Sequence, residues 1–423
     1  MGELKKWGLW AIAAYLLFGL CIYYYLFVFA NSSVPDIYKE TSADPATFLN
    51  SRELVLSEEY SKIRDLLFFL STPYEWLLYL FILIFGVSTV FEKWANQASR
   101  FQFVRNAVYL FWLSLLTFVL MFPIRYLSYH FSKTYHISAQ EFGGWMKDNV
   151  IDFWVNYLIM LVLVTILYAL MKQFPKKWWL ASWILFVPFT FFLMYVQPVW
   201  IDPLYNHFYP MKDKQLESKI LSLADKAHIP ANHVYEVDMS EKTHALNAYV
   251  TGVGSHSRIV LWDTTLQKLN DNEILFIMAH EMCHYVEKHI YFGIAGYLLL
   301  AFVGFWITAK WMARWIDRHG QKLHIQSISQ LRTLPLFLLI ISILVFASSP
   351  ISNLASRYEE TRADRYAIEM TKNKEAAIES FQELTKSGLS QVNPPLLVKI
   401  FRYTHPTMLE RIHMVETYPI KQK

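Results

Sequence analysis

Charged residues and cysteine are both scarce in this chain. Asp, Glu, Lys and Arg make up 17% of the 423 residues, compared with about 25% in ordinary soluble domains. The net charge of +4 is small for this length and gives no support for nucleic-acid binding. The two cysteines, Cys21 and Cys283, form no Cys-x-x-Cys pair, and we do not expect a structural disulfide.

Apolar residues, by contrast, are abundant and gathered in long runs. They make up 54% of the chain, including the 17% that are aromatic. Because about 20 mostly apolar residues are needed to cross the hydrocarbon core of a bilayer, such runs predict membrane helices. Seven segments qualify, at about residues 8–30, 73–91, 106–123, 151–171, 178–197, 291–313 and 333–349. The predicted fold class is therefore a mainly α, multi-pass integral membrane protein, with the first segment retained as a helix rather than removed as a signal peptide.

Two segments lack membrane-spanning character, 198–289 and 350–423, and together they have the size of one small domain. We therefore divide the chain into two parts. Residues 1–197 are predicted to form a membrane domain with five membrane helices. Residues 198–423 are predicted to form a small α+β domain that includes the last two membrane helices.

The first of these two segments shows both helical and strand patterns. Asn270 and Glu273 have the spacing of a capping box, which predicts the start of a helix at this point. A helix at 214–229 and three strands are expected before it, the strands at 233–240, 244–254 and 258–266.

The charge of the short loops predicts a topology. The N-terminus and three loops on one side carry 13 Lys and Arg residues, whereas 31–72 and 124–149 on the other side carry 7. Because Lys and Arg are enriched in cytoplasmic loops, the N-terminus is predicted to be cytoplasmic. The small domain is then expected on the side opposite the N-terminus.

The stretch "AHEMCH" has the spacing of a metal site. His280 and His284 are four residues apart, so on a helix both imidazoles lie on one face and suit one tetrahedral zinc ion. Glu281, beside the first histidine, could act as a general base on a water molecule at the metal. The alternative is a pair of surface histidines on an amphipathic helix.

A third protein ligand is required, and the sequence offers two places for it. His289 is one residue short of the spacing that a third histidine ligand takes in the metzincin pattern, so it is not expected to bind the metal. The stretch "ASRYEETRADRYA" offers Glu360, with Asp364 one turn further as a residue that could orient a histidine ligand. Glu359 competes with Glu360, and a charged solvated helix is the alternative to both.

These motifs together resemble the type I CAAX prenyl endopeptidases, which are membrane-embedded zinc metallopeptidases. The second motif of that family, Ser-Arg-x-x-Glu-x-x-x-Asp, falls on Ser356, Arg357, Glu360 and Asp364, and this favours Glu360 over Glu359 as the ligand. The resemblance implies one zinc ion per chain. It also implies a ring of seven membrane helices that encloses a chamber, with the metal site facing inward.

Two further stretches extend the resemblance. "HALNAYVTG" is similar to a family strand that pairs with the bound peptide, which implies a substrate contact for Asn247; an ordinary internal strand is the alternative that the sequence alone favours. "RYTHPTMLERI" resembles a His-Pro element followed by arginine. It implies that His405 stabilises the oxyanion or bonds to the substrate, and that Arg411 braces this region or the substrate. The family glycine before the second histidine is Cys283 here, which we expect to be a packing residue.

The expected partners are the lipid bilayer and a peptide or membrane-protein substrate, which the resemblance extends to prenylated proteins. If the chain is bacterial, we expect it in the plasma membrane. A quality-control peptidase with no prenyl preference is an open alternative, as is a zinc-binding membrane protein without protease activity. The sequence carries no indication of the oligomeric state.

Overall fold

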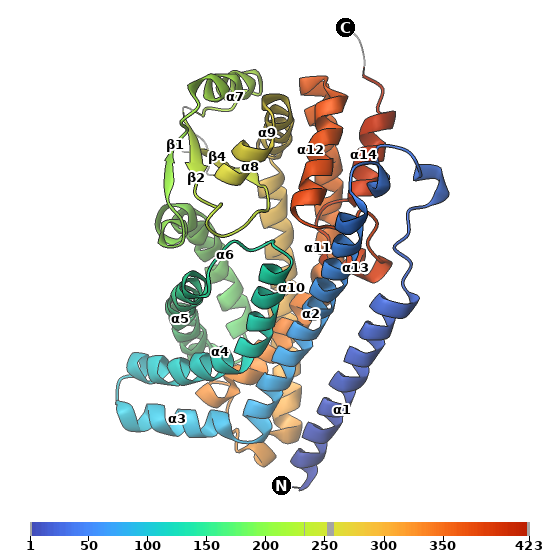
Figure 1. Ribbon diagram of the computed structural model, residues 1–423. Coiled ribbons are helices and arrows are strands. Elements are labelled where there is room, and N and C mark those ends of the chain that lie inside the picture. The colour runs from blue at the N-terminus through green and yellow to red at the C-terminus, as the bar shows by residue number, and fades with distance from the viewer. Residues whose placement is uncertain (1, 232, 252–257, 421–423) are drawn as a thin grey trace.

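The computed structural model describes residues 2–231, 233–251 and 258–420 and is mainly helical (Figure 1). Within these residues seven helical segments are long and apolar enough to cross a membrane, as the sequence predicts. They are Leu4–Phe29, Ser51–Ile84, Gln102–Thr134, Phe142–Gln173, Trp178–Leu204, His289–His319 and Leu331–Thr371. The corresponding α-helices are α1 (Gly2–Tyr24), α2 (Ser51–Ile84), α4 (Gln102–Thr134), α5 (Phe142–Gln173), α6 (Trp178–Val196), α10 (His289–His319) and α11 (Leu334–Thr371).

Large apolar side chains on these helices are exposed, as expected of surfaces that face lipid. Trp10 on α1 is 75% exposed and Phe292 on α10 is 68% exposed. A cluster of buried hydrophobic side chains, which includes Tyr109 and Met312, joins α2, α4 and α5 to α10 and α11. The membrane helices before and after the small domain therefore share one core.

The second membrane helix differs from the prediction at both ends. The helix α2 begins at Ser51, where Asn50 and Glu53 form a capping box, so much of the expected 31–72 loop is helical. It ends at Ile84, and α3 (Val87–Ala98) follows after Gly86, whose φ of 72° is left-handed. The predicted span at 73–91 was wrong in continuing past Gly86. A single glycine inside an apolar run does not by itself predict the end of a helix.

The small domain contains a four-stranded sheet in the part of the chain that the structure describes. Its order is β1 (Phe208–Pro210), β2 (Val234–Val237), β4 (Arg258–Trp262) and β3 (Ala248–Thr251). The strand β2 is parallel to β4, and β3 is antiparallel to β4. The sequence predicted the last three strands but not β1, and residues 252–254 of the expected second strand lie outside the described residues. Because β3 pairs only with β4 among the described strands, it is an edge strand, and the internal-strand alternative was wrong.

Helices pack around this sheet to form the domain core. The helix α9 (Asp271–Val286) begins at the predicted capping box of Asn270 and Glu273. Its Phe276 meets Phe381 with ring centroids 5.4 Å apart, and both side chains are buried. The other helices are α7 (Lys214–Lys226), α8 (Asp263–Lys268), α12 (Lys374–Ser387), α13 (Leu396–Arg402) and α14 (Met408–Thr417).

A sharp break separates α9 from the sixth membrane helix. Lys288 has a φ of 59° and lies in the left-handed region, which residues other than glycine seldom adopt. The helix α9 ends at Val286 and α10 begins at His289, so the helix that carries the histidine motif does not run straight into the sixth membrane helix.

The helix α11 is continuous from the last membrane span to the small domain. It runs for 38 residues from Leu334 to Thr371 and packs along α9. Figure 1 shows the N-terminal end of α1 and the sheet at opposite ends of the molecule.

Candidate active site

Three side chains from two helices converge where α9 packs on α11. His280 and His284 come from α9 and Glu360 comes from α11, and their candidate ligand atoms all lie within 4.8 Å of one another. Nε2 of His280 lies 3.0 Å from Oε2 of Glu360, and Nε2 of His284 lies 3.5 Å from Oε1. Glu359, one residue earlier on α11, is not part of this group.

This arrangement fits a tetrahedral zinc ion. Metal–ligand distances of about 2.0–2.1 Å place neighbouring ligand atoms about 3.3 Å apart. The two histidine Nε2 atoms are 3.4 Å apart, close to this spacing, so a proton or a metal ion has to lie between them. Oε2 of Glu360 is buried and accepts no hydrogen bond within the described residues. One cation would satisfy all three groups.

A buried ion pair orients the first histidine. Nδ1 of His280 donates a hydrogen bond to Oδ1 of Asp364 at 2.8 Å, which leaves Nε2 for the metal. Nε and Nη2 of Arg411 donate to the same carboxylate at 2.9 and 2.6 Å. Arg411 and Asp364 are both buried, and each neutralises the charge of the other, which would be costly to bury unpaired.

A different chain of contacts orients the second histidine. Nδ1 of His284 lies 3.0 Å from Nδ1 of His289, and Nε2 of His289 lies 3.1 Å from Oε2 of Glu287. Arg362 holds Glu287 through two hydrogen bonds of 2.5 and 2.8 Å, and they lower the pKa of Glu287. If His289 donates to this carboxylate from Nε2, its Nδ1 accepts the Nδ1 proton of His284. The lone pair of His284 Nε2 is then free for the metal.

The pKa values of His280 and His284 are shifted in opposite directions. Burial, and next the charge of His280, lower the pKa of His284 to about 4. Burial alone would also lower the pKa of His280, but its contacts with the carboxylates of Asp364 and Glu360 outweigh burial and raise the pKa to about 10. In the metal-free protein a proton on His280 therefore lies where a metal would bind.

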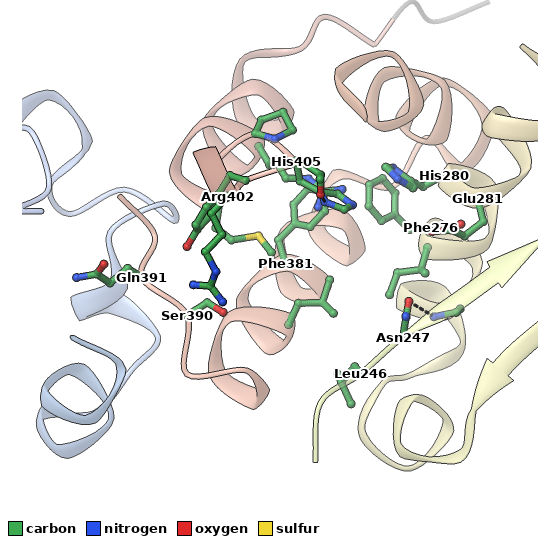
Figure 2. A pocket seen from close by; sticks show the side chains of 18 of the residues that line it. Leu246, Asn247, Phe276, His280, Glu281, Phe381, Ser390, Gln391, Arg402 and His405 are labelled. Carbon is green, nitrogen blue, oxygen red and sulfur yellow. Dashed lines mark hydrogen bonds between the residues drawn. The ribbon is translucent and has the colours of Figure 1, made fainter. Parts of the chain in front are cut away.

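Glu281 and His405 lie in one cavity with the first histidine. Burial raises the pKa of Glu281 to about 7, so this carboxyl group can exchange a proton near neutral pH. Nε2 of His405 lies 3.3 Å from Oε2 of Glu360, and the imidazole is 51% exposed. Figure 2 shows Glu281 and His280 together on α9, with His405 across the cavity from them.

Asn247 and Arg411 line the same cavity of about 420 Å³. Asn247 immediately precedes the edge strand β3, and its side-chain oxygen accepts the backbone N–H of Ala248 at 2.8 Å. Because both nitrogen donors described for Arg411 are engaged by Asp364, these contacts support its bracing role. Cys283 is fully buried, as expected of a packing residue.

Sequence reasoning missed the contacts of His289, Glu287 and Arg362. His289 is not in the ligand group, in agreement with the spacing argument. On an uninterrupted helix, however, His284 and His289 would point about 140° apart. The left-handed Lys288 between them turns the chain and brings the two rings to a centroid distance of 5.0 Å.

The fold and the metal-binding motif together define an integral membrane metallopeptidase. The family model described as "Peptidase family M48" matches residues 210–418, and the one described as "CAAX prenyl protease N-terminal, five membrane helices" matches residues 27–207. The chain belongs to peptidase family M48.

Relatives and a solved structure agree with this assignment. The chain is 51% identical to the "Uncharacterized metalloprotease YhfN" of Bacillus subtilis, over 98% of this chain and 97% of that protein. It is 27% identical to CAAX prenyl protease 1 of Saccharomyces cerevisiae, over 74% of this chain and 72% of the relative. The crystal structure of S. mikatae Ste24p has the same fold, with a TM-score of 0.79 at 21% identity over 96% of this chain and 97% of that one.

Proposed function

We propose that the chain is a zinc endopeptidase with one zinc ion per chain, held by His280, His284 and Glu360. The observation that carries the proposal is the convergence of these three ligands beside Glu281, in a cavity bordered by an edge strand. A zinc ion bound there would polarise the peptide carbonyl and lower the pKa of a water molecule.

The side chains of the protein then have separate tasks. Glu281 removes a proton from the attacking water and returns it to the leaving amine. His405 donates a hydrogen bond to the negative charge that develops on the carbonyl oxygen. Asp364 and Arg411 hold His280 in its ligand orientation. The edge strand β3, with Asn247 before it, binds the peptide as an added strand.

For the substrate, we propose a peptide segment of a membrane-associated protein. Relatives named CAAX prenyl protease 1 make a prenylated peptide the first candidate. The named function of YhfN extends only to metalloprotease, so a quality-control role without prenyl preference is the second candidate. Cleavage of one peptide with and without a farnesyl group separates them.

We propose that the N-terminus is cytoplasmic and that the site lies toward the opposite face, in the plasma membrane if the protein is bacterial. The distribution of Lys and Arg supports this orientation. We also propose the division into residues 1–197 and 198–423. Cysteine labelling from either side of the membrane tests the orientation.

The experiment for the mechanism compares three variants by zinc content and by cleavage of a fluorogenic peptide. Glu281→Gln is expected to keep one zinc ion and lose cleavage by at least about a hundredfold. Glu360→Ala is expected to lose zinc, whereas the matched Glu359→Ala is expected to keep both zinc and activity. Zinc loss in Glu359→Ala alone would overturn the ligand assignment. Absence of chelator-sensitive cleavage in the unmodified protein would favour a non-proteolytic zinc protein.

A further inference from the structure

An arginine on helix α2 has no described hydrogen bond or close ion pair. Arg64 lies on α2, and the structure gives its guanidinium no ion pair or hydrogen bond within the described residues; its Nε is buried and unpartnered. Its one described contact is with the ring of Tyr60, with Cζ 5.5 Å from the centroid. A guanidinium whose N–H donors are not used by the protein can bind an anion.

The carboxylate next to it in sequence is already used. Asp65 is buried and pairs with Nη1 of Arg402, which comes from the end of α13. Two guanidinium groups, those of Arg64 and Arg402, therefore share the negative charge of one carboxylate, which leaves an excess of positive charge at this place.

Arg64 lines the cavity that contains the catalytic site. The cavity of about 420 Å³ is bordered by His280 and Glu281 at one end and by Arg402 and Gln391 at the other. Figure 2 shows Arg402, Ser390 and Gln391 on the side away from Glu281, with His405 between. A peptide that crosses the metal site can therefore extend toward this cationic end.

A second unpartnered group lies in the same wall. Gln391 is 7% exposed, and neither Oε1 nor Nε2 of its amide has a hydrogen-bond partner in the described ranges. Its backbone N–H donates to Oγ of Ser61 at 3.3 Å, which fixes this residue against α2, one turn from Arg64. A buried amide without a partner is costly, so a ligand that bonds to it would remove that cost.

These groups match the chemistry of a carboxylate. A guanidinium N–H and an amide N–H are both donors, and a carboxylate accepts several hydrogen bonds in one plane. A cationic ligand would be repelled by Arg64, and an apolar chain would leave both groups unsatisfied.

We propose that Arg64 and Gln391 form a subsite for a carboxylate of the peptide substrate, at the end of the cavity away from Glu281. This proposal rests on the proposed function, since it selects among peptides that the metal centre cleaves. The carboxylate has two possible sources, the C-terminus of the peptide and an acidic side chain near it.

The test uses the full-length protein in detergent and three internally quenched peptides that share one sequence up to the last residue. The first ends in a free carboxylate, the second in an amide, and the third in an amide with glutamate as the last residue. We expect the unmodified protein to cleave a carboxylate-bearing peptide with a kcat/KM at least about tenfold above that of the plain amide, mainly through KM. Preference for the first peptide identifies the C-terminus, and preference for the third identifies a side chain.

The variants assign this preference to its residues. Arg64→Gln is expected to cleave all three peptides at the rate of the plain amide, while Arg64→Lys keeps part of the preference. Arg52→Gln, an exposed arginine on the same helix, serves as the matched control. Gln391→Leu is an independent second variant if Arg64→Gln fails to fold.

Two outcomes overturn the subsite and leave the proposed function intact. They are equal kcat/KM for all three peptides in the unmodified protein, and an unchanged preference in both Arg64→Gln and Gln391→Leu. Cleavage of none of the peptides by a zinc-loaded protein would instead count against the proposed function, on which the subsite depends.

Discussion

At the scale of single residues, the two histidines of the proposed metal site are held by unlike partners. His280 bonds to a buried carboxylate that Arg411 neutralises, whereas His284 contacts another imidazole. A carboxylate partner increases the basicity of a histidine ligand more than a neutral imidazole does. His284 is therefore expected to be the weaker ligand and to depend more strongly on its orientation.

The contact between His289 and His284 gives the first prediction. Replacing His289 with Phe removes the acceptor for Nδ1 of His284 and is expected to weaken zinc binding about 10- to 100-fold. Replacing it with Gln keeps an acceptor for His284 and a donor for Glu287, and most of the affinity should return. His233→Phe changes an exposed histidine of the same domain and is the control. Zinc competition with a chelator measures all three; equal affinities would show that His289 has no orienting role.

The pKa of His280 gives the second prediction. This pKa is raised to about 10 in the metal-free protein, so below that pH zinc must displace one proton. Zinc affinity is therefore expected to rise about tenfold per pH unit between pH 7 and 9 and to level off near the pKa. Proton release measured on zinc addition in two buffers should approach one proton per zinc at pH 8. Affinity that does not change over this range would contradict the raised pKa.

The sequence predicted the residues whose spacing is local and left out those that a turn brings together. His280, Glu281 and His284 follow from the helical period, and Glu360 follows from the family resemblance. The ligand roles themselves stay predictions. Glu287 and His289 are close in sequence to the motif, but their contacts depend on a left-handed residue in the stretch "YVEKHIYF". That stretch contains neither glycine nor proline and gave no signal for a turn.

At the scale of elements, the break between α9 and α10 sets the geometry of the second histidine. Lys288 occupies backbone space that favours glycine, at a cost of about 1–3 kcal/mol for other residues. Glycine should therefore be tolerated here, and a β-branched residue should not.

The third prediction tests this break. Lys288→Gly is expected to keep the zinc affinity of the unmodified protein, whereas Lys288→Val should destabilise the fold by about 1–3 kcal/mol and weaken zinc binding. His324, with a φ of 57°, lies after the Gln321–Leu323 turn and offers a matched control. His324→Val should have a similar backbone cost and leave zinc binding unchanged. Zinc affinity and thermal unfolding in detergent are the measurements. Zinc binding in Lys288→Val as strong as in the unmodified protein would show that the break between α9 and α10 does not affect the metal site.

Element boundaries show where sequence patterns lose information. The membrane helices were predicted because hydrophobic length is a strong signal, but their amphipathic extensions were not, as in α2 before residue 73. The strand β1 has only three residues and was missed. The edge position of β3 depends on strand order, which a hydrophobic pattern does not determine.

At the scale of the whole molecule, the proposed metal would join elements that differ in their relation to the bilayer. The helix α9 belongs to the small domain, and α11 emerges from the membrane core that α2, α4 and α5 share. A ligand that binds only the folded state stabilises it in proportion to the logarithm of its concentration.

The fourth prediction follows from this linkage. Zinc at a hundred times its dissociation constant should stabilise the protein by about 2.7 kcal/mol, and chelation should remove that gain. Glu281→Gln should retain the stabilisation, and Glu360→Ala should abolish it. The fluorescence of the 15 tryptophans reports unfolding in detergent. Equal unfolding midpoints with and without chelator would show that zinc binding at this site does not stabilise the fold.

Because α11 runs from the membrane to the candidate site as one helix, it sets the distance between the two. Val345, which is 62% exposed on the apolar part of the helix, and Glu360 lie on the same helix, with Pro350 between them. At about 1.5 Å per residue their separation along the axis is about 22 Å, so the reaction centre has a set height relative to the lipid. A substrate anchored in the same bilayer is then expected to be cut at a bond that is set mainly by its distance from the anchor.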